Sequence, residues 1–225
     1  MQNWHQVFNT IDGRDAWGTI RGYVYQVDVT IHRWLDLSET DVLELERGED
    51  IDIVHRDLKG DELSRELQQL KFREGNLSLN RAEIIEILKN YYLHRKNNAG
   101  HTLKFRFVTN STYTTEKPAI FPSEKGIDAW YRLAKLQNLD ASNVDLIRIR
   151  QQLQLMISKQ IIPVTDKLTD AQKEEQQSWT DFSTYLDDAS ELIDFIKNFE
   201  WSFRNEDQNQ VSKEISAVLA GKHGK

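Results

Sequence analysis

The chain has 225 residues, 39% of them hydrophobic, with a formal net charge of −7 and no cysteine. A chain of this length can bury one full core, or one core with a helical appendage. The lack of cysteine excludes disulfides, thiolate zinc sites and cysteine nucleophiles. The acidic balance argues against a protein that coats nucleic acid generally, so any contact with DNA must be local or must depend on a metal ion or on assembly.

No apolar run approaches the ~20 residues that a membrane-spanning helix needs, and the N-terminus lacks the basic-then-apolar order of a secretory signal. We therefore expect a soluble, cytoplasmic protein that makes no contact with a membrane. The final stretch, NQVSKEISAVLAGKHGK, has the pattern of a helix without a natural end. This pattern suggests a chain cut from a longer protein, with a partner domain downstream.

The first half of the chain predicts a helix followed by a group of strands. Apolar residues recur at helical spacing from Ile20 to Leu35, which predicts the first helix. From Asp41 the period changes to two, which predicts one or two half-buried strands with a bend at Gly48. After the turn LKGD a further strand alternates, with Leu67, Gln69 and Lys71 on one face and Gln68, Leu70 and Phe72 on the other.

A second helix, over residues 78–98, is predicted by an apolar stripe that begins after the capping candidates Ser78 and Asn80. The segment HTLKFRFVTNST alternates and predicts another strand. Beyond Pro122 the chain is expected to be mostly helical, over residues 126–160 and 171–203. The six tryptophans are expected to pack in the core rather than to stack on bases.

The acids before the turn and the polar residues after it fit a metal site. Residues i and i+2 of a strand point to the same side, so Gln69 and Lys71 are expected to converge on whatever Asp50 and Asp52 hold. Hydrolysis of a phosphodiester uses a divalent cation to activate water and a positive charge to stabilise the developing negative charge. The same spacing is also typical of solvated strand faces in an acidic protein, so the spacing alone leaves both interpretations open.

Four segments together resemble a known family: GYVYQ, ELERGEDIDIV, LQQLK and TLKFRFVTNS, within residues 18–111. They are similar to the endonuclease effector domain of bacterial antiphage defence proteins, in the PD-(D/E)XK superfamily. Such domains are fused to a nucleotide-sensing domain in CD-NTase-associated effectors, and to STAND-type NTPases in other defence systems. The resemblance implies a restriction-endonuclease-like α/β (α+β) core, a mixed sheet flanked by helices, over residues 1–120. A mostly helical extension would occupy residues 121–225 and lead to a downstream regulatory domain.

By the same resemblance, the catalytic residues are Asp50, Gln69, Lys71 and Gln26. Asp50, Asp52 and Gln69 would hold Mg²⁺ or Mn²⁺, and whether Asp50 or Asp52 is the main ligand stays open, although we favour Asp50. Gln69 replaces the commoner glutamate. Gln26 is explained equally well by a buried hydrogen bond. Glu44 and Glu46 share the acidic face, but strand parity cannot distinguish a ligand from a neighbour.

Several basic residues flank the predicted site and would contact phosphates of double-stranded DNA, namely Arg73, Arg95, Lys96, Lys104 and Arg106. Three hypotheses follow. The first is a metal-dependent DNA endonuclease that is activated when attached domains form a homo-oligomer. The second is a catalytically degenerate relative that binds DNA or supports assembly, which the neutral Gln69 favours. The third is a helical protein-interaction domain with incidental acids.

Overall fold

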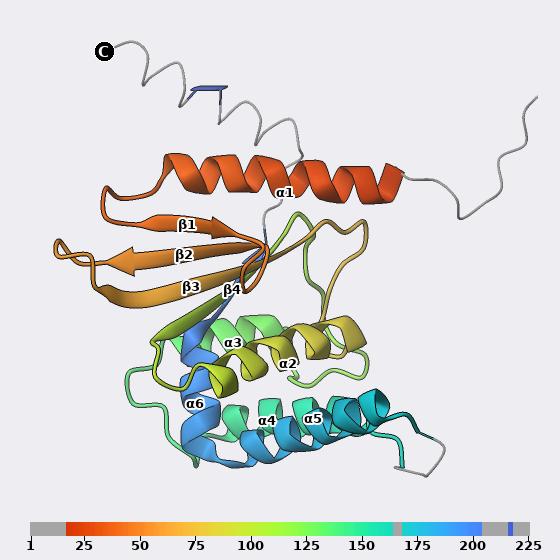
Figure 1. Cartoon of the computed structure of the whole chain (residues 1–225). Coiled ribbons are helices and arrows are strands. Elements are labelled where there is room, and N and C mark those ends of the chain that lie inside the picture. The colour runs from red at the N-terminus through yellow and green to blue at the C-terminus, as the bar shows by residue number, and fades with distance from the viewer. Residues whose placement is uncertain (1–16, 164–167, 204–215, 218–225) are drawn as a thin grey trace, which may run out of the picture.

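The structure is a computed structural model that describes residues 17–163, 168–203 and 216–217. It confirms the predicted fold class, a mixed sheet flanked by helices with a mostly helical C-terminal portion (Figure 1). In chain order the elements are α1 (Trp17–Leu35), β1 (Val42–Leu45), β2 (Ile51–Arg56), β3 (Glu62–Lys71), α2 (Ala82–Asn97), β4 (Leu103–Thr109), α3 (Gly126–Ala134), α4 (Val144–Ser158), α5 (Asp170–Asp187), α6 (Ala189–Asn198) and β5 (Phe199–Phe203). None of the helices in the described ranges is long and apolar enough to cross a membrane.

The five strands lie in sequence order, β1-β2-β3-β4-β5. The pairs β1–β2 and β2–β3 are antiparallel, whereas the pairs β3–β4 and β4–β5 are parallel. Since β1 and β3 both pair antiparallel with β2, four strands end on one side of the sheet, at Leu45, Lys71, Thr109 and Phe203. We call this side the carboxyl-terminal edge. Loops that follow these strands are therefore brought close together.

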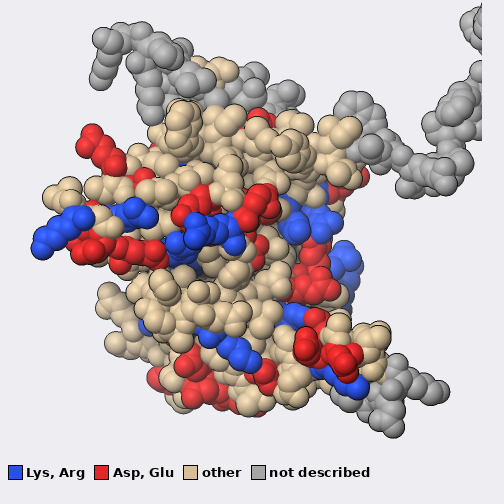
Figure 2. All heavy atoms as spheres, viewed as in Figure 1, with Lys and Arg blue, Asp and Glu red and all other residues tan. Residues whose placement is uncertain are grey.

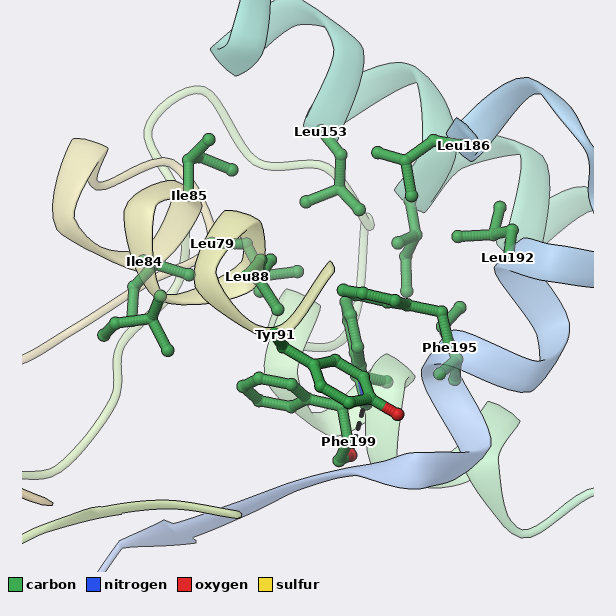
Figure 3. Packing of buried hydrophobic residues seen from close by; sticks show 14 of the residues in the cluster. Leu79, Ile84, Ile85, Leu88, Tyr91, Leu153, Leu186, Leu192, Phe195 and Phe199 are labelled. Carbon is green, nitrogen blue, oxygen red and sulfur yellow. Dashed lines mark hydrogen bonds between the residues drawn. The ribbon is translucent and has the colours of Figure 1, made fainter. Parts of the chain in front are cut away.

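Two hydrophobic clusters cover the two faces of the sheet. The larger cluster joins β3, β4 and β5 to helices α2 to α6, with Tyr91 between the rings of Phe195 and Phe199 (Figure 3). The smaller cluster places α1 on the opposite face, against β2 and β3. Leu67 belongs to the larger cluster and Leu70 to the smaller one, which confirms the predicted alternation of this strand.

Strand β5 is the main departure from the predicted elements, because the sequence was expected to stay helical to Phe203. The segment Phe199–Phe203 instead alternates, with Phe199 and Trp201 buried and Glu200 exposed between them, and it pairs with β4. Both the sheet and the larger cluster therefore extend past the boundary expected at residue 120.

Two smaller expectations also differ from the structure. The second helix begins after Arg81, and the capping candidates Ser78 and Asn80 lie in the preceding loop, where they bond to each other. In α1, Tyr25 and Val29 are buried against the sheet, whereas Tyr23 and Trp34 are exposed. The reason is that α1 lies alone on its face among the described residues, so the sheet covers one side of this helix.

The two environments of tryptophan give a test of the fold. Trp201 of β5 is 2% exposed, whereas Trp34 of α1 is 64% exposed. Trp201→Ala should lower the free energy of unfolding by about 3–5 kcal/mol, because it empties a buried site between the sheet and the helices. Trp34→Ala is the control and should change it by about 0.5 kcal/mol. Urea denaturation of both variants measures the difference, and similar values would contradict the placement of β5.

Candidate functional site

The loop that joins β1 to β2 forms one side of the site. Its backbone closes on itself, since the N–H of Glu46 donates to the carbonyl of Asp50 at 3.5 Å. Glu46 has a φ of 54°, in the left-handed region that a residue with a side chain seldom adopts. Strained backbone of this kind persists only where surrounding contacts hold it, and it is concentrated at functional sites.

Asp50 is fixed between α1 and the backbone of β3. Its Oδ2 accepts a hydrogen bond from the N–H of Leu70 at 2.6 Å. On the other side, Nε2 of Gln26 lies 3.4 Å from Oδ1 of Asp50 and donates to Oε1 of Glu46 at 2.7 Å. One amide from α1 thus holds two carboxylates that stand on either side of Gly48.

Burial raises the pKa of the Asp50 carboxyl above its ordinary value, and the neighbouring charges of Glu49 and Glu46 act in the same direction. The Leu70 N–H and the positive charge of Lys71 oppose this effect and favour the ionised form. Lys71 therefore lies close enough to Asp50 to act on its charge. A partly dehydrated carboxylate beside other acids is a favourable place for a cation to bind.

Gln69 precedes Leu70 in β3 and is 9% exposed. Its side-chain oxygen is buried and has no hydrogen-bond partner within the described part of the chain. Buried amide oxygens nearly always have a partner, and this one has the chemistry of a ligand for Mg²⁺ or Mn²⁺. The carboxylates of Asp50 and Glu46 have the same chemistry and are brought together by Gln26, whereas Gln69 lies with Leu67 on the face of β3 turned away from α1. The two carboxylates therefore fit part of the coordination of a divalent cation.

The protein would supply only part of such a cation's coordination. Among the residues described, no three histidine or acidic side chains are grouped so as to hold a metal ion. Mg²⁺ usually keeps several waters and binds through one or two carboxylates together with phosphate oxygens of a substrate. A site with two carboxylates is compatible with that mode of binding.

Asp52 does not join Asp50, and the expectation that the two acids share one face is wrong. Asp52 is fully buried and lines a cavity of about 390 Å³ next to His94 of α2, whereas Asp50 lines a separate cavity of about 300 Å³ next to α1. The parity of a strand holds only within the strand, and β2 begins at Ile51. Asp50 lies before that point, where the loop has turned its side chain toward α1.

The Asp52 carboxylate instead anchors the loop. It accepts the N–H of Glu49 at 3.1 Å and lies 3.5 Å from Nη1 of Arg65. A Cβ atom on Gly48 would come within 2.9 Å of its Oδ2, so glycine is required for this close approach. Burial raises the pKa of Asp52, while the Glu49 N–H and the charge of Arg65 oppose the shift. Asp52 thereby connects the loop that presents Asp50, at Glu49, to Arg65 of β3.

Glu46 is the site residue that sequence reasoning left out. Strand parity grouped it with Glu44, but only Glu46 reaches Gln26, whereas Glu44 bonds to Arg65 on β3. The signal that could have identified it is its position, since Glu46 and Asp50 stand two residues before and two residues after Gly48. Residues so placed around a hairpin bend lie near each other whatever the parity of the strands.

The predicted DNA-binding residues do not form one patch around Asp50. Figure 2 shows acidic and basic groups intermixed over the viewed face. Arg95 and Lys96 pair with Asp194 of α6 and Asp181 of α5. The other predicted residues lie on the strands or just after them: Arg73 pairs with Glu83, Arg106 pairs with Glu200 and Glu66, and Lys104 is exposed on β4.

The anchoring role of Asp52 predicts a local effect on the loop. Asp52→Ala should speed hydrogen exchange at the Glu49 N–H and lower the free energy of unfolding by about 1–3 kcal/mol, because a buried donor and Arg65 lose their partner. Asp52→Asn keeps an acceptor oxygen and is the matched control, with slower exchange than the alanine variant. Amide exchange measured by NMR distinguishes them. Unchanged protection of Glu49 in Asp52→Ala would contradict the anchor.

No protein-family model matches this chain, and searches of the curated proteins and of the solved structures also find no match. Function must therefore be inferred from the geometry around Asp50 and from the motifs of the sequence.

Proposed function

We propose that this chain is a metal-dependent endonuclease that hydrolyses phosphodiester bonds of double-stranded DNA. The observation that carries the proposal is the fixed position of Asp50, whose carboxylate is held by Leu70 N–H and Gln26 beside the charge of Lys71. A cation-binding carboxylate next to a lysine, at one edge of a sheet, is the arrangement that phosphodiester hydrolysis needs.

Each side chain has a role in this proposal. Asp50, Glu46 and Gln69 would hold Mg²⁺ or Mn²⁺, which when bound polarises the scissile phosphate and lowers the pKa of a water. Lys71 places its ammonium where negative charge grows on the phosphate as the bond to the leaving oxygen breaks. Gln26 orients the two carboxylates by donating to both. Asp52 is not included among the ligands, because its carboxylate is already bonded within the loop.

The order of elements supports the resemblance to restriction-endonuclease-like domains. A helix precedes three antiparallel strands, and a second helix then leads to a strand parallel to the third, with Asp50 just before the second strand and Lys71 at the end of the third. By that resemblance the domain would act in the bacterial cytoplasm as an antiphage effector. A sensor or NTPase domain of the same chain would activate it by bringing several copies together.

A second candidate function deserves its own test. Gln69 carries a neutral amide where the related enzymes more often have a glutamate, so the cation would be held less strongly. A catalytically degenerate module that binds DNA or supports assembly would keep the same fold without turnover. Cleavage of plasmid DNA in the presence of Mg²⁺ or Mn²⁺ separates the two functions.

Lys71 gives the sharpest test of catalysis. Lys71→Met should reduce Mn²⁺-dependent nicking by at least about 100-fold, because the charge that stabilises the transition state is lost. The side chain is half-buried, and we expect the free energy of unfolding to change by about 1 kcal/mol or less. Lys59→Met, in the exposed turn between β2 and β3, is the control and should cleave normally. A folded Lys71→Met protein with full activity would refute the assignment.

Calorimetric titration with Mn²⁺ tests the ligands without relying on activity. Asp50→Asn should weaken Mn²⁺ binding at least about tenfold, because the remaining oxygens include a single nearby carboxylate. Gln69→Glu should tighten binding by adding a charge. Asp52→Asn is the matched control, with affinity near that of the wild type. Equal affinity in the wild type and Asp50→Asn would show that the acids around Gly48 are a solvated face.

A further inference from the structure

A second polar cavity, of about 490 Å³, lies where the start of α2, the segment after β4 and the end of α4 meet. Three cationic side chains line it, one from each of these segments: Arg81, Lys117 and Lys159. Its other polar groups include Ser78 and Asn80. The chain brings these groups together from distant parts of the sequence, which is the reason that no local pattern predicted them.

The charge of this cavity sets it apart. Its lining contains no carboxylate, whereas four other surface cavities of the described residues each include at least one aspartate or glutamate. Within the described part of the chain, none of the three cations forms an ion pair, and Nζ of Lys159 lies 3.5 Å from Sδ of Met156. An uncompensated group of three cations in a protein of net charge −7 is suited to an anionic ligand.

The walls of the cavity are held in place by buried contacts. The carboxylate of Glu116 accepts the N–H of Leu79 at 3.2 Å and the N–H of Gly126 at 2.9 Å. Nδ2 of Asn80 donates to the carbonyl of Lys117 at 3.0 Å. Because the loops are already fixed, a ligand would not have to order them, and less binding free energy is lost.

The cavity lies at the carboxyl-terminal edge of the sheet, as the candidate site does. The segment just after β3 contacts the first turn of α2 through the ion pair of Arg73 with Glu83, and Arg81 stands two residues before Glu83. The ten residues from Lys71 to Arg81 can span at most ~36 Å. One turn of duplex DNA is ~34 Å long, so one duplex can reach both places.

We propose that Arg81, Lys117 and Lys159 bind backbone phosphates of the DNA duplex whose scissile phosphate lies beside Asp50 and Lys71. The proposal rests on the proposed nuclease function and adds to it the surface that positions the substrate. Phosphate contacts of this kind fix the register of a duplex without reading its sequence. Arg95 and Lys96 on α2 are ion-paired, and we assign this role instead to three cations that form no ion pair within the described chain.

The test is the salt dependence of DNA binding. We would measure binding of a fluorescent duplex of about 20 base pairs in Ca²⁺ by the wild type, by Lys117→Glu/Lys159→Glu, and by a control, Lys59→Glu/Lys135→Glu. The control reverses two exposed lysines outside the cavity, so the net charge is the same. The cavity variant should bind at least about tenfold more weakly, with a salt slope smaller by about two, since each lost phosphate contact removes about one unit.

Mn²⁺ affinity should be the same in all three proteins, because none of the changes touches Asp50. If both double variants lose DNA affinity equally, or if the cavity variant loses none while the wild type binds and cleaves DNA, the phosphate assignment is overturned and the nuclease function stands. A wild type that neither binds the duplex nor cleaves DNA with Mn²⁺ overturns both proposals.

Discussion

The hydrogen bond from the Leu70 N–H to the Asp50 carboxylate is the contact on which the site depends. Pairing of β2 with β3 stops at Ile51 and Gln68, and the Asp50 side chain takes the next position of the ladder. Its carboxylate thereby reaches the backbone between Gln69 and Lys71, whose side chains share the face of Leu67. The register is fixed by burial, because Leu70 must face α1 and Leu67 must face the opposite cluster.

The same contact holds the Asp50 carboxylate in a partly buried position, where burial disfavours its ionised form. Burial raises the pKa of Asp50 in the folded state above its unfolded value. The folded protein therefore holds the proton more tightly, and the contribution of Asp50 to stability is present at low pH and is lost as the pH rises through the folded pKa. At neutral pH the ionised Asp50 is a cost to stability, which is typical of a group that serves function rather than folding.

The basic residues of the surface differ in whether they form ion pairs. Most arginines on the strands and on α2 are paired with carboxylates, as Arg65 is with Glu44 and Arg106 is with Glu200. Such pairs reduce the positive field of the surface. The cations lining the cavity at the start of α2 form no ion pair within the described chain, and they lie at the carboxyl-terminal edge, where the candidate site also lies.

How far the sequence predicts this structure depends on where the periodicity is continuous. The alternation of Leu67 and Leu70 was read correctly, because both lie inside one strand. Asp52 was placed wrongly relative to Asp50, because the phase is lost in the loop before Ile51. Strand β5 was missed because Phe199 follows α6 directly, with no glycine or proline to mark the change. Contacts made by distant segments, such as Glu116 with Leu79, leave no local pattern to read.

The central claim is that a cation binds at Asp50, between α1 and the end of β3. Titration of ¹⁵N-labelled protein with substoichiometric Mn²⁺ tests it most directly, because the paramagnetic ion broadens the NMR signals of nearby amides. We expect the signals of the backbone amide of Leu70 and of the side-chain amide of Gln26 to broaden first. Broadening centred on Glu62 and His101 at the other end of β3, or spread evenly over the exposed acids, would contradict it.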